Sequence, residues 1–145
     1  MQSKKEREVL AERLDHHVEE EGKILAEYRA LSEKLGEGSV GFLVNLILTE
    51  EELHHLLLRT MAKWLREPPG EKDSIDVLKA NRRELLEYTR RLKKHEEETI
   101  NGCRDLGSEL LSKDEDLLCS LLDAMVLDSE KHHRLLGVVE KMLKA

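Results

Sequence analysis

Aromatic residues are scarce in this chain, at 3% of its 145 residues, and cysteine and proline occur only twice each. Strands favour aromatic and β-branched residues in alternation, and the sequence contains no such run. The two prolines, Pro68 and Pro69, are adjacent, so the remainder of the chain has no residue that breaks a helix outright. No apolar run approaches the roughly 20 residues of a transmembrane helix. These absences predict an all-α protein without a membrane span.

The net charge and the two cysteines indicate which partners and which cellular compartment to expect. The net charge is −7, and no basic patch is interleaved with aromatics as in single-stranded nucleic-acid binders. Cys103 and Cys119 fall at apolar or near-apolar helix positions, which favours reduced thiols in a core over a disulfide. The first ten residues are charged and lack the hydrophobic segment of a secretory signal. We therefore expect a cytoplasmic protein that binds neither nucleic acid nor membranes.

What the sequence does contain is the composition of long helices, with 38% charged residues and many leucines. Glycine and proline clusters, together with a Ser-x-x-Glu capping pattern, divide the chain at residues 36–38, 68–70 and 112–115. Ser39 is expected to cap the second helix, and Asn81 with Glu84 to open the third. The prediction is one four-helix-bundle domain over residues 1–145, with hairpin 1 over 1–67, a linker over 68–74 and hairpin 2 over 75–145.

Each predicted helix has an ionisable residue in the middle of an apolar stripe. At roughly 100° per residue, the central residues are Glu21, His54, Glu96 and His132. Burying an unpaired ionisable group costs several kcal/mol, so such groups are usually paired or bind a metal. The sequence therefore predicts that these four side chains converge on a shared polar centre.

The chain also contains an internal repeat. Residues 27–35 resemble residues 102–110, and at that offset of 75 Glu21 corresponds to Glu96. Residues 48–58 resemble residues 127–136, and at an offset of 78 His54 corresponds to His132. The chain is thus predicted to consist of two copies of a helical hairpin.

Two overlapping Glu-x-x-His patterns occur in each second helix. Glu52 and Glu130 lie roughly 160–170° from the apolar stripes and are expected to face solvent, as are His16, His55 and His133. The inward pair in hairpin 1 is Glu51 with His54. In hairpin 2, Ser129 stands at the position of Glu51, and Asp128 is the carboxylate expected to act with His132.

Together these residues resemble the ferritin-like superfamily, in its rubrerythrin-related branch. The matching features are Glu21 with Tyr28 seven residues on, Glu51-x-x-His54, Glu96, and a degenerate Asp128-Ser129-x-x-His132. The resemblance implies a four-helix bundle with a di-iron or di-manganese centre, and zinc is a further candidate metal. Its implied ligands are Glu21, Glu51, His54, Glu96, Asp128 and His132. Ser129 departs from the pattern, and the Cys-x-x-Cys electron-donor domain of rubrerythrins has no counterpart here.

Further ligands and other functions remain open at this stage. His17, one turn before Glu21, and Glu50 are secondary candidates for coordinating or orienting the metal ligands. The first functional expectation is an oxidoreductase or ferroxidase-like di-metal protein that reacts with oxygen or peroxide. The second is a metal-free scaffold or regulatory module with a buried His–carboxylate network. The third is a hemerythrin-like oxygen or iron sensor, because His17 and Glu21 follow that family's His-then-Glu order.

The sequence also predicts how the two hairpins are connected and that the protein forms an oligomer. A simple antiparallel connection at Pro68-Pro69 would separate the levels of His54 and Glu96 by about 12 Å. A third helix that starts at Asn81, after a segment that crosses back along the bundle, removes this mismatch. We therefore expect the ferritin-like crossover rather than a simple up-down-up-down bundle. Helix 2 also carries Val44, Leu48 and Leu56 outside its stripe, which predicts a homodimer or higher oligomer through this helix.

Overall fold

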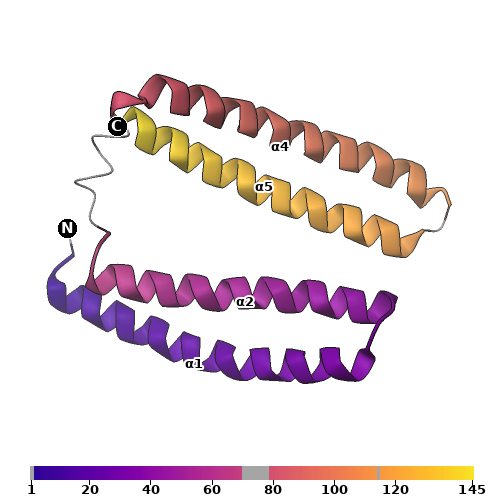
Figure 1. The fold of residues 1–145 in the computed structure, drawn as a ribbon, viewed down its shortest axis with the longest axis horizontal. Coiled ribbons are helices and arrows are strands. Elements are labelled where there is room, and N and C mark those ends of the chain that lie inside the picture. Colours follow the sequence, from indigo (N-terminus) through magenta and orange to yellow (C-terminus); the bar gives the residue numbers. More distant parts are fainter. Residues whose placement is uncertain (1, 70–78, 114) are drawn as a thin grey trace. The chain divides into compact units, whose positions relative to one another are not determined.

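The computed structural model describes residues 2–69, 79–113 and 115–145. Within these ranges the chain is all-α, as predicted, and contains no strand. The four long helices are α1 (Lys4–Leu35), α2 (Ser39–Arg66), α4 (Arg82–Leu111) and α5 (Asp116–Lys144) (Figure 1). None of the helices in the described ranges is long and apolar enough to cross a membrane.

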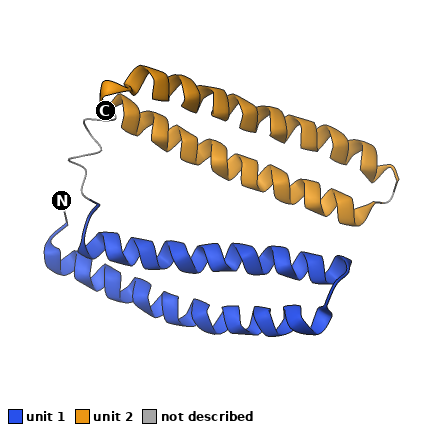
Figure 2. Cartoon of the chain, in the orientation of Figure 1, with its two compact units in different colours: residues 1–70 blue, residues 71–145 orange. Residues whose placement is uncertain are grey.

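The chain divides into two compact units, residues 1–70 and residues 71–145 (Figure 2). The first is an antiparallel hairpin of α1 and α2, and the second is an antiparallel hairpin of α4 and α5. We call them hairpin 1 and hairpin 2. Most of the predicted crossover, residues 70–78, lies outside the described residues.

The helix ends follow local capping chemistry, and two of the predicted caps are wrong. Ser39 is the first residue of α2 rather than its cap, because Gly38 occupies the cap position without a side chain to offer. At Ser112 the hydroxyl donates back to the carbonyl of Glu109, so it does not cap α5. A capping box does form between Ser3 and Glu6 at the start of α1, where none was predicted.

The turn between α1 and α2 depends on glycine. Gly36 and Gly38 have φ angles of 63° and 143°, a region that side-chain-bearing residues rarely adopt. Gly41, in the first turn of α2, is buried against this turn. The predicted glycine stop of α1 is therefore confirmed.

In each hairpin the two helices meet along a seam of buried and half-buried residues. The hairpin 1 seam repeats at alternating intervals of four and three residues, the spacing of coiled-coil helix pairs. It consists of Arg7, Ala11, Leu14, Val18, Glu21, Leu25, Tyr28 and Ser32 on α1, with Gly41, Val44, Leu48, Glu51, His55, Leu58, Ala62 and Leu65 on α2.

Hairpin 2 repeats this seam position by position. Adding 75 to the α1 positions and 78 to the α2 positions gives residues of α4 and α5 that are all buried or half-buried as well. An ion pair beside the seam is also duplicated, because Arg29–Glu52 at 3.5 Å corresponds to Arg104–Glu130 at 2.7 Å. The structure therefore supports the internal repeat that the sequence predicts.

A second surface, which we call the open face, runs along one side of each seam. Its side chains are largely apolar and half-buried or exposed on the hairpin considered by itself. In hairpin 1 it comprises Leu10, His17, Ile24 and Leu31 with Val40, Leu43, Ile47, Glu50, His54, Leu57, Met61 and Trp64. In hairpin 2 it comprises Leu85, Leu92, Thr99 and Leu106 with Leu118, Leu121, Met125, Asp128, His132, Leu135, Val139 and Met142.

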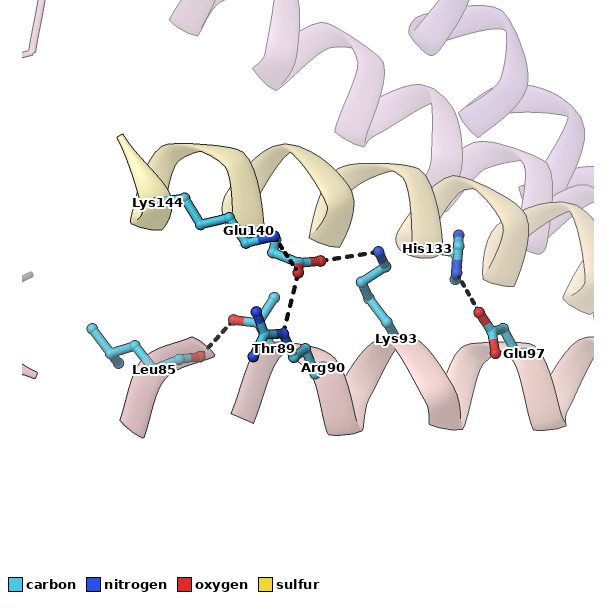
Figure 3. A network of polar contacts seen from close by, with 8 residues as sticks. All are labelled: Leu85, Thr89, Arg90, Lys93, Glu97, His133, Glu140 and Lys144. Atoms are coloured by element: carbon cyan, nitrogen blue, oxygen red, sulfur yellow. Dashed lines mark hydrogen bonds and ion pairs between the residues drawn. The ribbon is translucent and has the colours of Figure 1, made fainter. Parts of the chain in front are cut away.

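Glu140 is a carboxylate in the seam of hairpin 2, away from the middle of the helices. Glu140 of α5 accepts from Arg90 at 3.2 Å, from Lys93 at 3.1 Å and from Lys144 at 3.0 Å (Figure 3). The corresponding residue of hairpin 1 is Ala62, so hairpin 1 has no carboxylate at this position. These three cations lower the pKa of Glu140 to about 2, Lys144 contributing most.

Glu140→Gln is expected to lower the melting temperature of the protein at pH 7. The folded-state pKa is depressed, so the stabilisation is present above the ordinary value of 4.5 and is lost as the pH falls towards about 2. Thermal unfolding of both proteins between pH 7 and pH 2 measures the difference. Glu109→Gln, at an exposed position of α4, is the control and should change little. A Glu140→Gln effect that persists undiminished at pH 2 would contradict the assignment.

Candidate metal half-sites

The middle of hairpin 1 brings together three of the predicted ligands. Glu21 of α1 and Glu51 of α2 face each other across the seam, and the nearby carboxyl group of Glu51 raises the pKa of Glu21. His54 lies one turn beyond Glu51, with 3.7 Å between its Nδ1 and Oε2 of Glu51. The glutamate is 22% exposed and the histidine 53%, so the imidazole stands where the seam meets the open face. We call these three residues half-site 1.

The carboxyl group of Glu21 is the most constrained part of half-site 1. Its Oε2 atom is buried and has no hydrogen-bond partner. The hydrogen bond to Glu51, then burial, then the negative charge of Glu51 raise the pKa of Glu21 above its ordinary value, against smaller opposing effects of His54 and His55. Two neighbouring carboxyl groups, one of them with a buried oxygen atom that has no hydrogen-bond partner, fit a position that a cation would neutralise.

Half-site 2 is the corresponding set in hairpin 2. Glu96 of α4 lies in the seam at 18% exposure, and its Oε1 is 3.5 Å from Nδ1 of His132, which is 50% exposed. The position of Glu51 is taken by Ser129, which is buried at 6% exposure. Asp128 is half-buried at the edge of the open face, where it accepts from Lys131 at 3.1 Å. Half-site 2 therefore has one seam carboxylate where half-site 1 has two.

The secondary candidates lie outside the seam. His17 is exposed on α1, and Glu50 is half-buried on the open face. The rejected carboxylates Glu52 and Glu130 are 48% and 46% exposed and pair with arginines, which confirms that they face away from the polar centre.

The expectation that His55 and His133 are surface residues is wrong, because both are half-buried seam residues. Nε2 of His133 is 2.9 Å from Oε1 of Glu97 (Figure 3). In hairpin 1 the position of Glu97 is occupied by Gly22, where an added Cβ would lie 3.8 Å from Nε2 of His55. The adjacent histidines thus divide between the two surfaces of each hairpin, one in the seam and one on the open face.

Both cysteines are free thiols, with Cys103 buried and Cys119 half-buried. Among the described residues, no three His, Cys, Asp or Glu side chains lie in an arrangement that could hold one metal ion. Comparisons with protein-family models, curated proteins and solved structures find no match to the chain. The functional argument therefore rests on the two half-sites themselves.

Proposed function

We propose that this protein binds iron or manganese through its two half-sites, in the manner of a ferritin-like di-metal protein, in the cytoplasm. Glu21, Glu51 and His54 are the proposed ligands of half-site 1, and Glu96, Asp128 and His132 those of half-site 2. The observation that carries the proposal is the pairing of Glu21 with Glu51, with Oε2 of Glu21 buried and unsatisfied. A half-buried carboxyl pair is costly in an apolar seam unless a cation or proton neutralises it.

The types of ligand fit the proposed metals. Carboxylate oxygens suit manganese and iron, and imidazole is a good ligand for iron. Both histidines lie beside a seam carboxylate, at 3.7 Å and 3.5 Å, at positions related by the repeat. Each half-site offers one imidazole nitrogen and at least one carboxylate oxygen to a metal ion.

A bound di-iron or di-manganese centre would supply oxidation–reduction chemistry towards oxygen or peroxide. The protein's own residues have simpler roles in this proposal. Glu21 and Glu51 offer oxygen atoms from the seam, and His54 and His132 offer nitrogen atoms from its edge.

Metal titration of the full chain tests the proposal. Wild-type protein is expected to bind manganese(II) or, without oxygen, iron(II) stoichiometrically, and Glu51→Ala is expected to lose this binding. Glu52→Ala is the matched control, because Glu52 is the next residue of α2 but pairs outward with Arg29. Bound metal is measured by mass spectrometry after gel filtration. Wild-type protein without metal, or equal losses in both variants, would refute the proposal.

The two half-sites are expected to differ in affinity. Half-site 2 has the buried Ser129 in place of a carboxylate, and Asp128 is already engaged by Lys131. Asp128→Ala should therefore cost less metal than Glu51→Ala in the same titration. Two sites of equal affinity would count against this asymmetry.

A metal-free scaffold is the second candidate function. One observation favours it, namely that Glu96 already has a partner in His132 and that Ser129 is uncharged. Under this function, added metal leaves wild-type protein and all variants unchanged.

A further inference from the structure

The seam histidines of the two hairpins have different surroundings. In hairpin 2, Nε2 of His133 is 2.9 Å from Oε1 of Glu97 on the facing helix (Figure 3). The residue of α1 that corresponds to Glu97 is Gly22, which has no side chain to offer to His55. His55 is half-buried and has no hydrogen-bond partner among the described residues. Both of its ring nitrogens are therefore open to another ligand.

His55 lies beside the carboxyl pair of half-site 1. It follows Glu51 by four residues, so both side chains point from one face of α2 towards α1. Its Nε2 is 3.8 Å from the position that a Cβ on Gly22 would take, and Gly22 directly follows Glu21. Against the rise caused by Glu51 and by burial, His54 and His55 each act to lower the pKa of Glu21. The seam of hairpin 1 thus brings an unpaired imidazole to the level of two carboxyl groups.

The spacing of Glu51 and His55 suits coordination of one ion. Ligands four positions apart on a helix can bind the same metal, as the two histidines of the His-Glu-x-x-His zinc motif do. Oε2 of Glu21, which is buried and has no hydrogen-bond partner, offers a third donor from the facing helix. All three residues belong to hairpin 1, so this donor set is complete within one of the two compact units.

We propose that His55 is a further metal ligand of half-site 1, and that this second imidazole increases the preference of the half-site for iron(II) over manganese(II). The inference rests on the proposed metal-binding function. Because the donors do not surround one point in the described structure, coordination includes a turn of the imidazole. Room for this turn exists at Gly22, since no atom of α2 other than Nε2 of His55 lies within 4 Å of an added Cβ.

The predicted preference follows from ligand chemistry. Imidazole suits iron, whereas carboxylate oxygens suit manganese, so an added imidazole favours iron(II). Hairpin 2 lacks the same donor set, because Ser129 replaces Glu51 one turn before the seam histidine. In addition, Glu97 already engages Nε2 of His133. His133 is therefore expected not to bind metal, and it serves as the matched control.

The dissociation constants of the full chain for iron(II), without oxygen, and for manganese(II) test the proposal. His55→Gln is expected to weaken iron(II) binding by at least about tenfold, because loss of even an outer-shell partner costs roughly 10–100-fold in metal affinity. Manganese(II) binding should weaken less, because manganese depends more on the carboxylates. His133→Gln should bind both metals as the wild type does.

Glutamine is used in both variants because its amide keeps a hydrogen-bonding group in the seam. Circular dichroism of the metal-free proteins should show the same helix content in both. If the wild type binds metal and His55→Gln binds both metals equally well, His55 is not a ligand, although the proposed function stands. Equal losses in the two variants, or equal weakening for the two metals, would indicate a general effect on seam packing and would overturn the proposal. A wild type that binds neither metal would refute the proposed function as well.

Cobalt(II) gives a direct view of the bound imidazoles. A histidine that coordinates this paramagnetic ion shows a ring N–H proton resonance shifted far outside the normal range. Cobalt(II)-loaded wild-type protein is expected to show one such resonance that is missing from His55→Gln and retained in His133→Gln. Retention of every shifted resonance in His55→Gln would contradict coordination by His55.

Discussion

Manganese(II) at a hundredfold excess over its dissociation constant is expected to raise the free energy of unfolding of the wild-type protein by about 2.7 kcal/mol. A ligand that binds only the folded state stabilises it by this amount, whichever residues hold the ligand. His54→Ala and His132→Ala are each expected to lose the gain, because each removes an imidazole that lies within 4 Å of a seam carboxylate. Urea unfolding with and without metal measures the effect.

His16→Ala is the control for this experiment, since His16 is exposed on α1 outside both half-sites. The control variant should keep the full metal-dependent gain. If manganese and iron leave the wild-type stability unchanged while His54→Ala still destabilises, the histidine acts through packing and the metal-free scaffold is the better description.

Gly41→Ala is expected to destabilise the protein by about 1–3 kcal/mol, the usual cost of overpacking a close contact. A Cβ at this position would lie 2.1 Å from the carbonyl oxygen of Gly36, which is a backbone atom of the α1–α2 turn. The turn must then shift, although Gly36 and Gly38 fix its path through their positive φ angles. The denaturation midpoint, followed by circular dichroism, measures the loss.

Gly102→Ala is the matched substitution in the other hairpin. Nothing lies within 4 Å of a Cβ at this position, and alanine favours a helix over glycine by up to about 1 kcal/mol. This variant should therefore become more stable. Equal effects of the two substitutions would show that the contact between Gly41 and the turn does not constrain the hairpin.

The helices could be predicted from the sequence because glycine, proline and apolar spacing mark them directly. Breaks were predicted at residues 36–38 and 112–115, and α1 ends at Leu35 and α4 at Leu111, directly before them. The predicted caps at Ser39 and Ser112 failed because capping depends on turn geometry that neighbouring residues set. At Ser39, the preceding glycines carry the backbone into the helix one residue earlier than a serine cap would.

The candidate site was predicted only in part. Apolar spacing assigns one stripe to each helix, whereas the helices bury a seam and also present an adjacent open face. Ile24 and Ile47 lie in the apolar stripes that contain Glu21 and His54, yet they are 41% and 43% exposed. The seam follows Ala11 and Gly41, whose small side chains give close helix contact but little hydrophobic signal. Because the seam has so weak a hydrophobic signal, the sequence did not predict that His55 and His133 lie in it.

The regular spacing of the seam affects how the register between α1 and α2 is determined in hairpin 1. An apolar seam that repeats every seven residues would pack almost as well if one helix slid by seven residues along the other. By the antiparallel count, such a slip would set Glu51 against Leu14 or Tyr28 and Glu21 against Leu58 or Val44. Each carboxyl group would then be buried against an apolar or aromatic side chain, at a cost of several kcal/mol. The polar centre thereby fixes the register of the two helices, whether or not a metal is bound.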